Sequence, residues 1–175
     1  NLPVWQPERV RALSPDSLGV KPDFFVVAEY GQIIPQAWLD WPVISTINVH
    51  PSILPNYRGP TPIQSALLRG DTETGVTIMQ LEATVDSGPI IAMAKTTISA
   101  DEVYTDVEKR LTELGGPLLC DSLVQLANKT LIPVPQDHSQ ATFCQKLTRD
   151  SGRIDWQHSA DTIYNQYRAL TPWPG

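Results

Sequence analysis

Residues 48–59 read Asn48-Val49-His50-Pro51-Ser52-Ile53-Leu54-Pro55-Asn56-Tyr57-Arg58-Gly59, and they follow an apolar run over residues 43–47. The run predicts a buried strand, and Asn48 and His50, two residues apart, share one face of it. The prolines stiffen the backbone of the turn that follows. An amide beside an imidazole at the carboxyl end of a strand can stabilise an oxyanion while the imidazole handles a proton. A capped turn with a structural histidine is the other interpretation.

The composition narrows the class of protein. A length of 175 residues suits one domain, or one domain and the start of another, and a hydrophobic content of 41% is enough for a core. No apolar run reaches membrane-spanning length. With 13 basic and 19 acidic side chains the net charge is −6, which argues against a general nucleic-acid-binding surface but leaves a local basic patch open. Cysteines and histidines show no metal-ligand spacing, so we expect no metal and reduced cysteines.

Strand-like and helical segments alternate along the chain. Buried strands are predicted over residues 23–28 and 44–49, and further strands over 75–82 and 89–98. The six residues between the last two strands favour an antiparallel hairpin. The fold class is therefore α/β, with a mostly parallel sheet and an antiparallel hairpin at its edge.

Helices are predicted from apolar periodicity and caps. One begins at Pro62 behind Thr61 as N-cap, a long one follows Asp101 as N-cap, and the last covers residues 160–170 behind Ser159. Gly115-Gly116-Pro117 is expected to kink or split the long helix. Residues 2–20 predict an extended piece and then a polar turn, residues 36–40 a short helix, and residues 128–152 a loop.

Asp86 is the third candidate for chemistry. It lies in the predicted hairpin loop before Ser87 and Gly88. Asp-Ser-Gly is also ordinary turn sequence, so a purely structural role stays open. If the loop folds over the end of the second strand, the carboxylate meets His50, where it favours the imidazolium and can relay a proton. Ser52 lacks the flanking glycines of a nucleophile elbow, and the sequence has neither a P-loop nor a dinucleotide-binding glycine motif.

The motif at residues 48–55 closely resembles the active-site signature of the folate-dependent formyltransferases, and Asp86 followed by Ser-Gly-Pro resembles their catalytic aspartate. Within that family the likeness is to the enzymes that act on methionyl-tRNA. It is carried by four further segments: residues 57–64, 70–80, 153–156 and 172–175.

The resemblance implies a Rossmann-like formyltransferase domain over residues 1–150 and, over residues 151–175, a linker toward a small β-barrel domain. The first strands of that fold and most of the barrel are not in the sequence, which begins with Asn1, so we expect a fragment of a longer protein. The whole protein is expected to be a monomer, and the fragment to self-associate at a bare sheet edge. A cytoplasmic location of bacterial type is expected, with an organelle as the alternative.

The implied activity moves the formyl group of 10-formyltetrahydrofolate to the amino group of methionine on initiator tRNA. Asn48 and His50 would stabilise the oxyanion, and Asp86 would keep His50 protonated and assist proton transfer. Arg58 is a candidate for holding an anionic part of the substrate. Implied folate contacts are Ser52, Ile53, Leu54, Pro55, the backbone of Gln32 and Ile34, and the hairpin loop at Ala83 and Val85.

Two alternatives stay open. One is a related formyltransferase that acts on an amino sugar or a purine precursor, and the other is a folate-binding module without turnover. Glu29 also departs from the family, which usually has a small or neutral residue beside the folate pocket.

Overall fold

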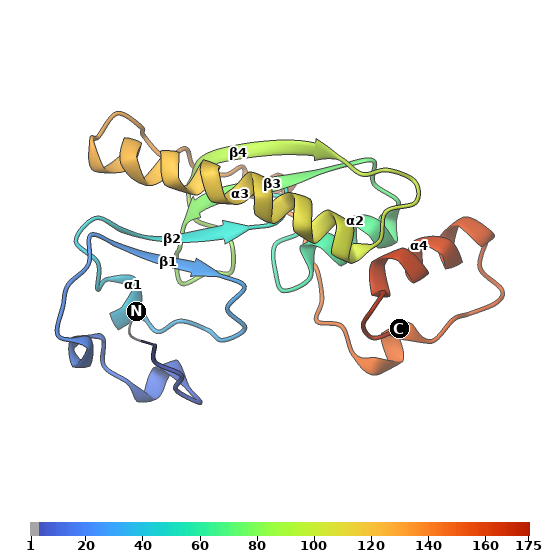
Figure 1. The fold of residues 1–175 in the computed structure, drawn as a ribbon, viewed down its shortest axis with the longest axis horizontal. Helices are drawn as coiled ribbons and strands as arrows, with labels where there is room; N and C mark the ends of the chain where they lie inside the picture. Colours follow the sequence, from blue (N-terminus) through green and yellow to red (C-terminus); the bar gives the residue numbers. More distant parts are fainter. Residues whose placement is uncertain (1–3) are drawn as a thin grey trace.

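The computed structural model describes residues 4–175, and its centre is a four-stranded sheet in the order β1-β2-β3-β4 (Figure 1). The strands are β1 (Phe24–Ala28), β2 (Ser45–His50), β3 (Glu73–Gln80) and β4 (Ile90–Thr97). Strands β1 and β2 run parallel, whereas the β2–β3 and β3–β4 pairs are antiparallel. The α/β class and the antiparallel hairpin are thus confirmed.

The sheet is mixed rather than mostly parallel, which corrects the expected balance of strand directions. Strand β3 is buried along most of its length, on both faces, as is typical of a strand in a parallel sheet. Burial therefore marks β3 as a central strand but says nothing about its direction. The direction is set by the return of the chain after β2 through a turn and one short helix.

The helices are α1 (Gln36–Leu39), α2 (Pro62–Arg69), α3 (Tyr104–Ala127) and α4 (Ala160–Leu170). Short 3-10 turns occur at Val10–Ala12, Pro15–Leu18, His138–Gln140 and Arg149–Gly152. Helix α3 packs along β3 and β4, while α2 and α4 lie side by side at the other end of the molecule (Figure 1). Among residues 4–175, no helix combines the length and the apolar character needed to cross a membrane. The main core includes Ile47, Leu67, Val76, Ile78, Val107 and Leu111.

Helix α3 runs unbroken through Gly115-Gly116-Pro117, so the expected split does not occur. A Cβ at Gly115 would lie 3.3 Å from a methyl carbon of Val76, which shows how closely the helix approaches β3 at this point. The helix also begins later than expected. The Asp106 carboxylate accepts a hydrogen bond from the Val103 backbone N–H at 3.0 Å, and Asp101 is not the cap.

The other two helix caps had different outcomes. Ser159 caps α4 as predicted, because its Oγ accepts from the Thr162 backbone N–H at 3.2 Å. Thr61 does not cap α2 with its side chain; its hydroxyl donates to the Gln145 carbonyl oxygen at 2.8 Å instead. Of the expected extended piece over residues 2–20, residues 2 and 3 lie outside the described residues.

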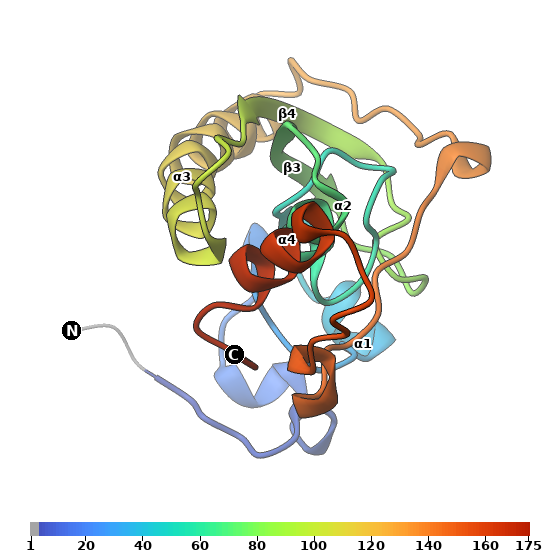
Figure 2. The same cartoon turned by 90° about the vertical axis from the view of Figure 1, so that its right-hand side faces the viewer.

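The segment over residues 128–159 connects α3 to α4 without regular strands. Figure 2 shows α3 on one flank of the molecule and this segment descending along the other. It forms two isolated bridges, Val134 with Ile90 in β4 and Phe143 with Arg58 in the turn after β2. A region that the sequence predicts as a loop therefore packs against the turn after β2 and the start of β4.

Candidate active site

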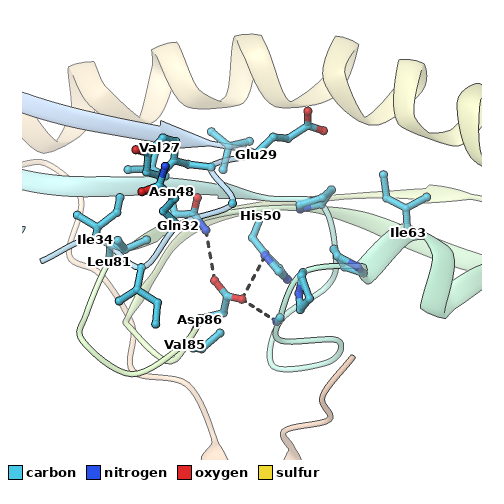
Figure 3. Close-up of a pocket in the computed structure, with 18 of the residues that line it drawn as sticks. Val27, Glu29, Gln32, Ile34, Asn48, His50, Ile63, Leu81, Val85 and Asp86 are labelled. Carbon is cyan, nitrogen blue, oxygen red and sulfur yellow. Dashed lines mark hydrogen bonds and ion pairs between the residues drawn. The ribbon is translucent and has the colours of Figure 1, made fainter. Parts of the chain in front are cut away.

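A cavity of about 460 Å³ lies at the carboxyl ends of β1 and β2, where ligands bind in open α/β sheets (Figure 3). Its walls come from three stretches: residues 29–34 after β1, residues 48–51 at the end of β2, and residues 81–86 after β3. Helix α2 adds Ile63 and Gln64, and α3 adds Tyr104. Residues that are far apart in the sequence thus enclose one space.

Asp86 joins the other two candidate side chains inside this cavity. Its Oδ1 accepts from the Asn48 amide Nδ2 at 3.3 Å, and its Oδ2 lies 3.7 Å from His50 Nδ1 (Figure 3). The Gly59 backbone N–H donates to the same Oδ2 at 2.7 Å. The hairpin loop therefore does fold over the end of β2, as the functional interpretation of Asp86 required.

The contacts of His50 show which of its ring nitrogens carries a hydrogen. Its Nε2 lies 2.9 Å from the Tyr57 carbonyl oxygen, which can only accept, so Nε2 carries a hydrogen. In the neutral ring Nδ1 then has its lone pair toward Asp86 and the cavity. The residue is only 3% exposed, and this burial lowers the pKa of His50, outweighing the Asp86 carboxylate and the Tyr57 hydrogen bond that raise it. Burial and the Asp86 carboxylate thus act on this pKa in opposite directions, and the expectation that Asp86 holds His50 protonated stays a prediction.

Two backbone groups of the site were missed by sequence reasoning, namely the Tyr57 carbonyl and the Gly59 N–H. Gly59 has φ of +118°, and a Cβ there would lie 2.7 Å from the Cys144 carbonyl oxygen. Gly59 itself was the available signal, since glycine is favoured where the backbone adopts a positive φ or approaches another segment closely.

The four residues from Ser52 to Pro55 are not among those that line the cavity, and their expected folate contact stays a prediction. Ser52 is buried, and its hydroxyl donates to the Asn56 carbonyl oxygen at 2.6 Å. The Leu54 backbone N–H donates to Thr77 Oγ1 at 3.2 Å, and Ile53 lies against Gly75. Pro55, half-buried, ends this turn. These residues build the turn that supports His50.

Arg58 does not line the cavity either, and its expected role in holding a substrate anion stays a prediction. The residue is buried, its Nε and Nη2 donate to Gln136 Oε1 at 3.2 and 2.7 Å, and Nη2 lies 3.0 Å from His138 Nδ1. The guanidinium is used inside the protein, against a segment 78 residues further along the chain.

The remaining predicted contacts do line the cavity. Gln32 and Ile34 form one wall, with the Gln32 amide held by the backbone of Glu8 and Val10 at 3.1 and 3.2 Å. Ala83 and Val85 form the wall near Asp86. Glu29 lies at the rim beside Tyr104, whose pKa is raised by burial and by its hydrogen bond to Glu108. Among residues 4–175 no group of three or more histidine, cysteine or acidic side chains is placed to hold a metal.

Comparison with known proteins agrees with this geometry. The formyl transferase family model matches residues 7–123, and the model of the formyl transferase C-terminal domain matches residues 146–175. Methionyl-tRNA formyltransferase of Pseudomonas syringae pv. tomato is 43% identical over 176 residues, covering 99% of this chain and 56% of the relative. That of Citrifermentans bemidjiense is 40% identical over 178 residues, covering 99% and 55%. The chain thus spans about half the length of these curated relatives.

Solved structures share the fold at lower identity. HypX of Aquifex aeolicus in complex with tetrahydrofolic acid has a TM-score of 0.77 at 23% identity, over 89% of this chain and 27% of that one. The N-formyltransferase of Helicobacter canadensis has 0.72 at 21%, over 83% and 54%. With a family model matched over most of its length and a fold shared with these structures, the chain belongs to the formyl transferase family.

Proposed function

We propose that this chain is the catalytic part of a methionyl-tRNA formyltransferase, which moves the formyl group of 10-formyltetrahydrofolate to the amino group of methionine on initiator tRNA. The observation that carries the proposal is the meeting of Asn48, His50 and Asp86 at one cavity wall. Relatives 40–43% identical over 99% of the chain, named methionyl-tRNA formyltransferases, support this acceptor.

The cavity fits a folate by its chemistry. Aliphatic side chains of Val27, Ile34, Leu81 and Val85 offer apolar surface for a flat ring system, and the irregular backbone around Gln32 and Ala83 offers polar groups at its edge. The folate would supply the formyl group, already activated as an amide of its nitrogen.

The reaction releases one proton and takes up one, and Asn48, His50 and Asp86 are placed to assist it. The methionine amine forms a bond to the formyl carbon and loses one proton, while the folate nitrogen leaves and gains one. Asn48 has a second amide hydrogen that can donate to the formyl oxygen as it gains negative charge. Asp86 or His50 Nδ1 can accept the amine proton.

The lowered pKa of His50 supports a role as proton acceptor in this scheme. If His50 gains a proton only as the reaction proceeds, its attraction to Asp86, 3.7 Å away, grows at that moment. An interaction that is stronger in the transition state than in the ground state accelerates the chemical step. A residue that was charged from the start would lack this difference.

The division of the chain is part of the proposal. Residues 1–150 would form the catalytic domain, and residues 151–175 would lead to a C-terminal domain; the two family matches, over residues 7–123 and 146–175, support such a boundary. We place the whole protein in a cytoplasmic compartment, where initiator tRNA is charged and formylated, and the named relatives are bacterial.

The test is formyl transfer by the whole protein with charged initiator tRNA and 10-formyltetrahydrofolate. We expect transfer to methionyl-tRNA and none to a nucleotide-linked amino sugar. His50→Ala should abolish transfer while folate affinity, measured by calorimetry, stays close to that of the unchanged protein. Transfer that survives in His50→Ala would refute the assigned chemistry, and transfer to the sugar alone would refute the acceptor.

A further inference from the structure

Gln136 is a buried amide that the chemistry above does not use. It is 6% exposed and lies in the irregular segment between α3 and α4, 50 residues beyond Asp86. Its Nε2 donates to the carbonyl oxygens of Asp86 at 3.0 Å and Gly88 at 2.7 Å. Its Oε1 accepts from Arg58 Nε at 3.2 Å and Nη2 at 2.7 Å. These four bonds use the full capacity of a primary amide.

The amide nitrogen of Gln136 bonds the loop that carries Asp86, and its amide oxygen bonds Arg58 in the turn that contacts His50. On one side is the loop that carries Asp86. On the other is Arg58, whose neighbours supply the Tyr57 carbonyl to His50 and the Gly59 N–H to Asp86. Gln136 therefore joins, through hydrogen bonds, the turn that orients the imidazole and the loop that carries the carboxylate.

The Asp86 loop needs such support. Residues 81–89 contain no strand, and Asp86 has φ of +46°, which is uncommon for a residue other than glycine. Backbone that is irregular and strained keeps one conformation only when its surroundings fix it. The segment that carries Gln136 is itself fixed, because Val134 exchanges two backbone hydrogen bonds of 2.8 Å with Ile90.

We propose that Gln136 is a positioning residue, which sets the distance between Asp86 and His50 by tying the Asp86 loop to Arg58. It does not line the cavity, so it acts through Asp86 rather than on the substrate. The inference rests on the proposed function for its kinetic consequence, but the placement of Asp86 can be tested without turnover.

The test is Gln136→Glu in the whole protein. The carboxylate keeps an acceptor for Arg58 but loses the donor to Asp86 and Gly88. We expect kcat for formyl transfer to fall about 10- to 100-fold with little change in KM. The NMR titration of the His50 ring should also shift to lower pH, because Asp86 is held less closely. The new carboxylate alone would shift it to higher pH, so a downward shift reports the position of Asp86.

Gln166→Glu is the matched control. Gln166 Nε2 also donates to two backbone carbonyl oxygens, those of Ser151 at 2.9 Å and Arg153 at 3.1 Å, but in α4, outside the cavity walls. This variant should lose some thermal stability and keep the kcat and the His50 titration of the unchanged protein. A folded Gln136→Glu protein that also keeps both would overturn the proposal.

Arg58→Lys is the second variant, for use if Gln136→Glu does not fold. It keeps the charge but can donate only from one atom to Gln136. We expect the same changes in kcat and in the His50 titration, at smaller amplitude, and a folded Arg58→Lys protein without them would also overturn the proposal. If the unchanged protein shows no transfer but the His50 titration moves as expected, the proposed function fails and the positioning role stands.

Discussion

The two halves of the candidate site are held by different means. We call Asn48 and His50 with the turn to Gly59 the strand-held half, and residues 81–88 with Asp86 the loop-held half. Strand β2 pairs on both sides, with β1 and with β3, so its end is fixed by backbone hydrogen bonds. The loop-held half has no such ladder and depends on a glutamine and a backbone N–H from elsewhere. A precise distance between two side chains therefore requires only one of them to lie on a regular element.

The largest effect should come from the loop-held half. Asp86→Asn removes the proton acceptor while the amide can keep the hydrogen bond from Gly59. Removing a positioned acid or base costs about 10²- to 10⁴-fold in rate, and we expect kcat for formyl transfer to fall by that factor. Asp16→Asn, on an exposed turn, should not change it. A similar loss in both variants would show that charge alone, not this carboxylate, matters.

Gly59→Ala changes the residue through which the strand-held half contacts Asp86 in the loop-held half. The alanine would have an unfavourable φ of +118° and a Cβ 2.7 Å from the Cys144 carbonyl oxygen, so urea unfolding should show a loss of about 1–3 kcal/mol. Gly116→Ala is the control, because its Cβ meets nothing within 4 Å in exposed α3 and should raise stability by up to about 1 kcal/mol. Equal stabilities for both variants would contradict the described turn.

The dependence of stability on pH tests the titration of His50 in the strand-held half and the effect of Asp86 in the loop-held half on it. The pKa of His50 is lowered by burial from 6.5, so as pH falls below that value the unfolded chain binds more protons than the folded one and stability decreases. We expect a lower urea midpoint at about pH 5.5 than at 7.5, and a smaller difference in His50→Gln. Asp86→Asn removes a group that raises this pKa, so the NMR titration of His50 should move further down. An upward shift would mean that the carboxylate does not face the ring.

The smallest expected effect concerns self-association through β1, the strand at one edge of the sheet. Within residues 4–175, β1 pairs only with β2, and Val26 on it is 38% exposed. We expect this chain, expressed alone, to self-associate through that edge, and Val26→Lys to reduce the apparent mass in light scattering. Val124→Lys, on exposed α3, is the control and should leave the association unchanged. A monomer at all concentrations would refute the role of β1.

The regular elements could be predicted from the sequence because apolar spacing and caps are local. The periodicity of residues 44–50 placed Asn48 and His50, and the hairpin placed Asp86 in a loop. Strand direction could not be predicted, because β3 is buried on both faces whichever way it runs. Nor could the roles of Gln136 and Arg58, whose hydrogen bonds join residues 78 apart and leave no local pattern. The folate contacts implied for Ser52–Pro55 stay a prediction, because resemblance identifies a motif but not which of its side chains face the cavity.

The packing of residues 134–144 against the turn after β2 has a consequence for biosynthesis. A ribosome releases His50 and Asp86 well before Gln136 and Cys144. Gln136 bonds the Arg58 side chain, and the Cys144 backbone N–H donates to the Arg58 carbonyl oxygen at 2.8 Å. At about 5–20 residues per second, the 58 residues from Asp86 to Cys144 take roughly 3–12 s to be made. All four strands are complete well before the end of that interval, while the two residues proposed to carry out the chemistry await the segment that sets their distance.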